Sequence, residues 1–151
     1  MSLWSRWRNS AEPAMAGEPG NPGASGAHLR LGRKGEEAAR AELERMGMTV
    51  LCANYRHGRG EIDLIVRDGE VLAFVEVKSR SSESWVRPAQ AVGRAKQRML
   101  SDTALAYLNA LGRPRVAFRF DIVEVLFAGP DVREVRHLPD AFPLAAGRMY
   151  L

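Results

Sequence analysis

The 151-residue chain has one cysteine, Cys52, and aromatic residues make up only 7% of it. A single thiol cannot form a disulfide within the chain, and no second thiol is present to share a zinc ion with it. No stretch of consecutive apolar residues approaches the length of about 18 that a transmembrane helix needs. The start, MSLWSRWRNS, also lacks the apolar stretch of a secretory signal. These absences exclude a disulfide scaffold and predict a cytoplasmic protein with no membrane partner.

Several common catalytic motifs are missing as well. The three histidines, His28, His57 and His137, are scattered and have neither HExxH nor zinc-like spacing. The serines of SRSSES stand outside a Gly-x-Ser-x-Gly context. The glycines of GRKGEE and HGRGE match neither a P-loop nor a dinucleotide fingerprint. The chemistry of these motifs is therefore not expected.

The chain begins with a Gly- and Pro-rich segment and continues as ordinary globular sequence, 46% hydrophobic and 26% charged overall. Residues 1–27 contain stretches such as GEPGNPGASGA, which have too little apolar surface to support a core. We predict that residues 1–27 form a disordered tail in which Trp4 and Trp7 have no fixed contact. Residues 28–151 are predicted to form one domain.

Helical and strand patterns alternate along this domain. Helical spacing covers residues 29–47, and a second helix is predicted from Pro88 to about Gly112. Strand patterns occur between the helices in MTVLCANYR, GEIDLIV and EVLAFVEVK, and after the second helix in VAFRFDIVEVLF and VREVRHL. This order predicts one α/β domain with a mixed sheet. The expected core-facing side of the second helix consists of Ala91, Ala95, Met99, Leu105, Ala106 and Leu108.

The dipeptide Asp68-Gly69 predicts a hairpin turn. With this dipeptide as the two-residue loop, Glu61 lies opposite Glu76 and Asp63 lies opposite Phe74. Alternation along the two strands then separates two faces. One face is apolar and is expected to be core: Ile62, Leu64, Val66, Val71, Ala73, Val75 and Val77. The other face carries Glu61, Asp63, Ile65, Leu72, Phe74, Glu76 and Lys78.

The charged end of this second face has the composition of a metal site. Glu61, Asp63 and Glu76 repel one another when they are crowded, and a divalent cation with hard oxygen ligands, Mg²⁺ or Mn²⁺, relieves that repulsion. Lys78 is placed to stabilise charge on a phosphate or to orient an attacking water. The alternative is a solvent-facing hairpin whose acids pair with Lys78 and nearby arginines. Phe74 and its apolar neighbours on the same face predict cover by a helix, and from the residues alone both interpretations stay open.

Charge is distributed unevenly along the chain, which has a net charge of +4. Residues 61–76 have a net charge of −4, whereas residues 78–119 have a net charge of +7. An acidic hairpin followed by a basic loop and helix suits a metal site beside a phosphodiester track. The alternative is a solvated helix face. The expected phosphate contacts are Arg80, Arg87, Arg94 and Arg98, with Trp85 available to stack on a base.

The hairpin contains a pattern with the form of the nuclease motif D…(D/E)-x-K. Asp63 is followed, after twelve residues, by Glu76-Val77-Lys78. The surrounding sequence resembles the YraN-like family of bacterial proteins, which are predicted nucleases related to Holliday-junction resolvases. The matching stretches run from Gly32 to Phe142: GRKGEEAA, NYRHGRGEIDLIVRDG, FVEVKSRSS, PAQAVGRAKQRML, RFDIVEV and HLPDAF.

The resemblance implies a restriction-endonuclease-like αβββαβ core, with a mixed central sheet flanked by helices. It implies that Asp63 and Glu76 hold the metal, that the Val77 carbonyl is a third ligand and that Lys78 is the catalytic lysine. Glu36 corresponds to an acid that approaches the metal in some relatives; its alternative is an exposed helix glutamate. Gln90 stands where relatives often carry Glu, so no catalytic acid is expected from the second helix.

The predicted function is therefore a Mg²⁺- or Mn²⁺-dependent nuclease that acts on nucleic acid. DNA is favoured over RNA, which stays open as an alternative, and branched or junction DNA is one candidate substrate. The alternative is a catalytically silent nucleic-acid-binding or scaffold protein that retains the nuclease fold. Because resolvase-like enzymes act on two strands, a symmetric homodimer is compatible with this function.

Overall fold

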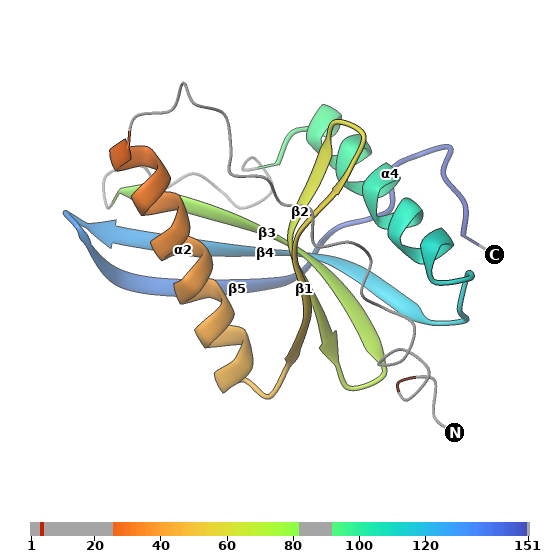
Figure 1. Cartoon of the computed structure of the whole chain (residues 1–151), viewed down its shortest axis with the longest axis horizontal. Coiled ribbons are helices and arrows are strands. Elements are labelled where there is room, and N and C mark those ends of the chain that lie inside the picture. The colour runs from red at the N-terminus through yellow and green to blue at the C-terminus, as the bar shows by residue number, and fades with distance from the viewer. Residues whose placement is uncertain (1–3, 5–25, 82–91, 151) are drawn as a thin grey trace.

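A computed structural model describes Trp4, residues 26–81 and residues 92–150 of the chain. Its elements are, in order, α2 (Gly26–Arg45), β1 (Thr49–His57), β2 (Gly60–Asp68), β3 (Val71–Ser81), α4 (Arg94–Ala110), β4 (Ala117–Ala128) and β5 (Asp131–Phe142) (Figure 1). The predicted order of helix, three strands, helix and two strands is confirmed, and with it the restriction-endonuclease-like α/β fold class.

The five strands form one mixed sheet in the order β1-β2-β3-β4-β5. The β3–β4 pair is parallel, and the other neighbouring pairs are antiparallel. A parallel pair needs a crossover connection, and the segment that contains α4 supplies it. The sheet therefore presents two faces to the two helices.

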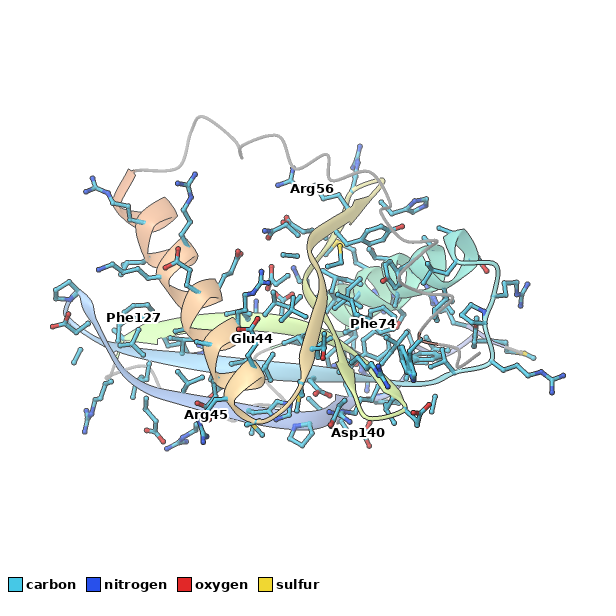
Figure 2. All side chains as sticks on the ribbon, turned by 60° about the horizontal axis from the view of Figure 1, so that its bottom comes forward. Glu44, Arg45, Arg56, Phe74, Phe127 and Asp140 are labelled. Carbon is cyan, nitrogen blue, oxygen red and sulfur yellow. The ribbon has the colours of Figure 1, made fainter. Side chains whose placement is uncertain are left out.

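Each face of the sheet is covered by one helix. Leu64, Val66, Ala73 and Val75 pack against α2, together with its buried Leu43. The intervening residues Ile65, Leu72 and Phe74 pack with Leu100 and Tyr107 of α4, and Phe74 is in edge contact with Tyr107. In Figure 2, Phe74 lies on the α4 side and Phe127 near α2. The predicted helical cover of the Phe74 face is confirmed.

Ile62 differs from its predicted face. It is fully buried, but in the α4 cluster rather than with Leu64 in the α2 cluster. The β1–β2 pair turns away from β3 at this point and runs beside α4 (Figure 1), so strict alternation from Leu64 does not continue to Ile62.

The predicted core-facing side of α4 is only partly confirmed: Leu108 is buried, and Leu105 is half-buried and packs against the α4 cluster. The buried residues are Leu100, Ser101, Thr103, Ala104, Tyr107 and Leu108, whereas Ala95 is exposed and Met99, Leu105 and Ala106 are half-buried. Ala91 lies outside the described residues. The alanine spacing was misleading because small side chains bury little apolar area; Leu100 and Tyr107 determine which side of the helix faces the sheet. This rotation turns Lys96 toward the sheet.

The hairpin register is shifted by two residues from the prediction. Asp68 pairs with Val71 and Ile65 with Phe74, so Gly69-Glu70 is the two-residue loop. Gly69 has a φ of 60° and Glu70 is not in the left-handed region, which fits a type II′ turn with glycine first. Because the shift is by an even number of residues, it leaves each residue on its predicted face of the hairpin but changes the residue that lies opposite it.

Two glycines let the helices approach the strands closely. A Cβ at Gly35 of α2 would lie 2.1 Å from Ser79 Oγ of β3, and a Cβ at Gly60 of β2 would lie 2.0 Å from Thr103 Oγ1 of α4. Both glycines directly precede an acidic residue in the sequence. They therefore bring α2 and α4 against the strands next to the acidic residues.

Trp4 departs from the expectation that it has no fixed contact. Its side chain is buried in the α4 cluster, and its indole Nε1 donates a 2.8 Å hydrogen bond to Glu70 Oε2. The Arg67 guanidinium lies 4.2 Å from the centre of the indole ring, a cation–π contact. Trp7 and the rest of residues 1–25 lie outside the described residues, so the tail itself stays a prediction.

Candidate functional site

Strands β2 and β3 separate at the centre of the sheet. Their paired residues end at Leu64 and Val75, beyond which β2 stays paired with β1 as far as Gly60 and β3 stays paired with β4 as far as Ser81. Asp63 and Glu76 are the next residues on each side of this separation, which we call the fork. In Figure 1 the β1–β2 pair rises from the fork beside α4, while β3 runs beneath α2.

Asp63 closes the fork with its side chain. Its Oδ2 accepts a 2.8 Å hydrogen bond from the backbone N–H of Val77 in β3. Burial raises the pKa of Asp63 to about 7, and the charges of Glu76, Glu36 and Glu61 act in the same direction, although the Val77 N–H opposes them. The four carboxyl groups of Glu36, Glu61, Asp63 and Glu76 thus form one electrostatically linked set, the acidic cluster.

Glu36 is the member of the acidic cluster that comes from α2. Burial raises its pKa, as do the charges of Glu61 and Glu76, while a hydrogen bond from the Asn54 side chain lowers it. Asn54 has a φ of 54° within β1, a left-handed conformation that asparagine tolerates better than most residues. The alternative of an isolated, exposed helix glutamate does not fit this position.

Glu76 is only 5% exposed. Its Oε1 lies 3.3 Å from Lys78 Nζ and 3.4 Å from Lys96 Nζ, so two ammonium groups share one carboxylate oxygen. The other oxygen, Oε2, is buried and has no hydrogen-bond partner among the described residues. A buried carboxylate oxygen is costly to leave unpaired, and oxygens of this kind are ligands that Mg²⁺ and Mn²⁺ prefer.

The donors that could hold such an ion are two carboxylates and a carbonyl rather than a larger acidic group. Over residues 26–81 and 92–150, no three His, Cys, Asp or Glu side chains are arranged as a metal-binding set. Glu61 instead pairs with Arg56, 3.6 Å away. Figure 2 shows Arg56 on the β1–β2 pair. Asp63 and Glu76 fit the predicted donor pair, with Val77 between Glu76 and Lys78; Glu61 as a ligand stays a prediction.

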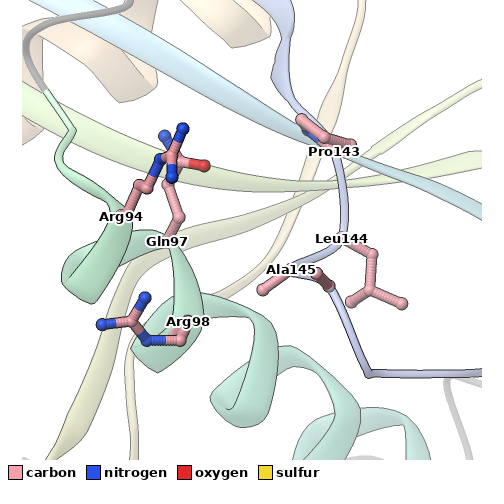
Figure 3. A pocket seen from close by; sticks show the side chains of 7 residues that line it. Arg94, Gln97, Arg98, Pro143, Leu144 and Ala145 are labelled. Carbon is pink, nitrogen blue, oxygen red and sulfur yellow. The ribbon is translucent and has the colours of Figure 1, made fainter.

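The predicted phosphate contacts are only partly brought together. Arg94 and Arg98 are exposed on α4, and within the described residues neither has an ion pair or hydrogen bond. Both line a pocket of about 260 Å³ between α4 and residues 143–146 (Figure 3). Arg80 is half-buried on β3, and its Nε has no hydrogen-bond partner in residues 26–81 and 92–150. Trp85 and Arg87 lie outside the described residues and stay predictions.

Sequence reasoning missed Lys96 and Asn54 as members of the site. Lys96 was counted only as part of the basic region, because the predicted core-facing side of α4 left it in solvent. If Leu100 and Tyr107 are taken as the core-facing residues of α4, Lys96 falls on the same side of the helix and faces the sheet. Asn54 gave no signal, since its left-handed backbone is set by tertiary structure.

A buried polar network around Asp121 in β4 was missed as well. Asp121 accepts hydrogen bonds from Arg119 and from the Asp140 N–H, and it lies 2.7 Å from His137 Nε2. Burial alone would raise the pKa of Asp121, but these hydrogen bonds outweigh it and hold the pKa below its ordinary value. Arg119 also pairs with Asp68. This arginine therefore ties β4 to the hairpin and does not add to the basic surface.

The fold and the fork together define an α/β protein with a restriction-endonuclease-like core and an acidic cluster at the point where two central strands separate. The chain belongs to the family described as "Uncharacterised protein family UPF0102", whose model matches residues 35–125. The predicted membership in the YraN-like family is thereby confirmed. The matched range contains Glu36, Asp63, Glu76, Lys78 and Lys96.

Relatives from several bacteria match most of the chain. The UPF0102 protein of Geobacter sulfurreducens is 41% identical over 115 residues, which is 76% of this chain and 90% of that protein. The UPF0102 protein of Syntrophus aciditrophicus is 44% identical over 121 residues, 80% of this chain and 94% of that protein. The one from Symbiobacterium thermophilum is 46% identical over 114 residues, 75% of this chain and 96% of that protein.

Neither described helix is long and apolar enough to cross a bilayer. The cytoplasmic location and the homodimer stay predictions.

Proposed function

We propose that this protein is a divalent-metal-dependent nuclease that hydrolyses phosphodiester bonds in DNA, with Mg²⁺ or Mn²⁺ as its cofactor. The observation that carries the proposal is the fork, where the half-buried Asp63 and the buried Glu76 lie on the two sides of the strand separation and Lys78 Nζ lies 3.3 Å from Glu76 Oε1. Two acids and a lysine in this arrangement have little value for stability, because burial and mutual repulsion disfavour their charged forms. They are well suited to bind a cation and a phosphate.

Each residue of the site would have a role in hydrolysis that follows from its chemistry. Asp63, which still has Oδ1 besides the oxygen bonded to Val77, and Glu76, with its unpaired Oε2, would hold the ion together with the Val77 carbonyl. A bound divalent ion supplies charge neutralisation and a more acidic water. Lys78, whose ammonium lies beside Glu76, would stabilise negative charge on the phosphate oxygens. Glu36, whose pKa is raised by burial and by the charges of Glu61 and Glu76, would hold or take a proton from the attacking water.

The basic side of the molecule supports DNA as the substrate. Arg94 and Arg98 lie one turn apart on α4 and expose their guanidinium groups beside the pocket in Figure 3. Contacts of this kind bind the phosphate backbone without reading base sequence, which suits an enzyme that recognises DNA structure. Branched or junction DNA is the substrate that we propose, with a symmetric homodimer acting on two strands.

A substrate panel tests this function. The protein is incubated with duplex, single-stranded, flap and four-way-junction DNA and with RNA, in Mg²⁺, in Mn²⁺ and in chelator. We expect metal-dependent cleavage of DNA, most of all junction DNA, and no cleavage by Asp63→Asn under any condition. Tight DNA binding with no cleavage of any substrate in either metal would support instead a silent DNA-binding protein with a nuclease fold.

A further inference from the structure

Glu76 has two cationic partners that come from different elements. Lys78 follows it on β3, whereas Lys96 reaches it from the first turns of α4, with Nζ 3.4 Å from Glu76 Oε1. Both ammonium groups contact the same oxygen, and within the part of the chain that the structure describes Oε2 is buried and has no hydrogen-bond partner. The carboxylate is therefore held by one oxygen, which leaves the other available.

The position of Lys96 on its helix is unusual for a charged residue. Leu100, Thr103, Ala104 and Tyr107 form the buried side of α4, and Lys96 continues that side by one turn toward the N-terminus. An apolar residue is expected at such a position. The side chain is 36% exposed, and its ammonium lies 3.4 Å from the buried Glu76 carboxylate. Packing does not require a lysine there, but Glu76 does.

We infer that Lys96 is a positioning residue of the active site, which holds Glu76 by Oε1 and thereby presents Oε2 to the metal ion. Its presence frees Lys78 for the phosphate, because one ammonium cannot both neutralise the buried carboxylate and follow charge that develops on the substrate. The inference rests on the proposed function, since the direction of Oε2 matters only if Glu76 binds an ion.

The test compares Lys96→Met, which keeps the length of the side chain and removes its charge, with Arg115→Met. Arg115 is exposed just before β4 begins, away from the fork, and has the same change in charge. In Lys96→Met we expect kcat for DNA cleavage to fall about 10- to 100-fold, as for other residues that orient a metal ligand. The KM for DNA should stay unchanged, and Mn²⁺ should bind at least as tightly as in the parent, because a repelling cation has gone. Lys96→Arg should recover much of kcat, since a guanidinium can also hold Oε1.

A second readout needs no activity. Without metal, Lys96→Met should lower the urea midpoint of the parent but leave the midpoint of Glu76→Gln unchanged, because the pair exists only with the carboxylate. If Lys96→Met does not fold, Lys96→Gln and Lys96→Arg carry the same comparisons.

The outcomes separate the inference from the proposed function. A parent that binds Mn²⁺ and cleaves DNA, with Lys96→Met indistinguishable from Arg115→Met, would overturn the role of Lys96 and leave the nuclease intact. A raised KM with unchanged kcat would make Lys96 a DNA contact and would overturn the inference as well. A parent that neither binds Mn²⁺ nor cleaves DNA would overturn the proposed function, and the positioning role with it.

Discussion

The Asp63 carboxylate accepts a hydrogen bond from the Val77 backbone N–H at 2.8 Å, just beyond the last residues that pair β2 with β3. A side chain thus bridges the two strands where their main chains have separated. This contact holds Asp63 against the segment of β3 that contains Glu76 and Val77, the residues that we propose as the other metal donors. Asparagine retains an oxygen that can accept the same hydrogen bond, so Asp63→Asn isolates the effect of the charge.

The charge of Asp63 should make the metal-free protein less stable as the pH rises. Asp63 has a pKa of about 7 in the folded protein against an ordinary value of 3.8, so the folded state holds its proton more tightly. The stability that this proton contributes is complete below about pH 4 and is lost as the pH rises to about 7 and beyond, by on the order of 4 kcal/mol at most. Urea unfolding in chelator at pH 5 and pH 8 measures the effect, with Asp63→Asn as the control. Relative to the variant, the parent should lose stability at the higher pH; a constant difference between them would contradict the raised pKa.

Arg94 and Arg98 should contribute to DNA affinity through phosphate contacts alone. The double variant Arg94→Ala/Arg98→Ala should weaken binding equally for all sequences and reduce the slope of log K against log salt by up to about 2. Fluorescence anisotropy over a range of salt concentrations measures both quantities. Arg115→Ala/Arg133→Ala, two exposed positions elsewhere, is the matched control. If the two double variants bind alike, the DNA track does not pass over α4.

Trp4 should stabilise the domain although it lies far from it in sequence. Its buried indole contacts the β2–β3 turn through Glu70 and Arg67. Trp4→Ala should lower the free energy of unfolding by about 1.5 to 3 kcal/mol, the value for burying a large apolar side chain. Trp4→Phe should lose less, because only the N–H donor and part of the ring area are removed. Thermal unfolding decides the question, and an unchanged melting temperature in Trp4→Ala would show that the contact contributes nothing.

A pair of substitutions, Gly35→Ala and Ser79→Ala, tests the close approach of α2 to β3, because the second should relieve the clash that the first creates. A methyl group at Gly35 meets Ser79 Oγ at 2.1 Å but Ser79 Cβ only at 3.4 Å. Gly35→Ala should therefore destabilise the parent, by about 1 to 3 kcal/mol for an overpacked contact. In a Ser79→Ala background the clash disappears, and the same change should be neutral or stabilising by up to about 1 kcal/mol through helix propensity. Equal effects of Gly35→Ala in both backgrounds would rule out this contact as the cause.

Element order and the core faces of β2 and β3, except at Ile62, could be predicted because apolar alternation is a local signal. The hairpin register could not, since Asp68-Gly69 and Gly69-Glu70 both make acceptable two-residue loops. Pairing of Asp68 with Arg119 of β4, 51 residues away, favours the register in which Asp68 stays within the strand. A tertiary contact of this kind has no local signature.

The site residues on the strands were found through the nuclease motif, whereas the contributions of the helices needed the structure. Glu36 followed only from the family resemblance. Lys96 was missed because alanines at 91 and 95 suggested a different core-facing side from the one that Leu100 and Tyr107 impose. A charged residue that continues a buried helix side is a signal, but it becomes visible only when that side has been assigned correctly.

Calorimetric titration of Mn²⁺ into the parent, Asp63→Asn and Lys78→Ala tests the central claim most directly. The account predicts that Mn²⁺ binds the parent, that it also binds Lys78→Ala because lysine is no ligand for a hard cation, and that Asp63→Asn has lost the site. All three proteins should be folded in chelator, with Asp63→Asn at least as stable as the parent at pH 8, because one of several crowded carboxylates has become neutral. Unchanged Mn²⁺ affinity in Asp63→Asn, together with a clear loss of metal-free stability, would contradict the metal site and show that Asp63 is a structural partner of nearby cations.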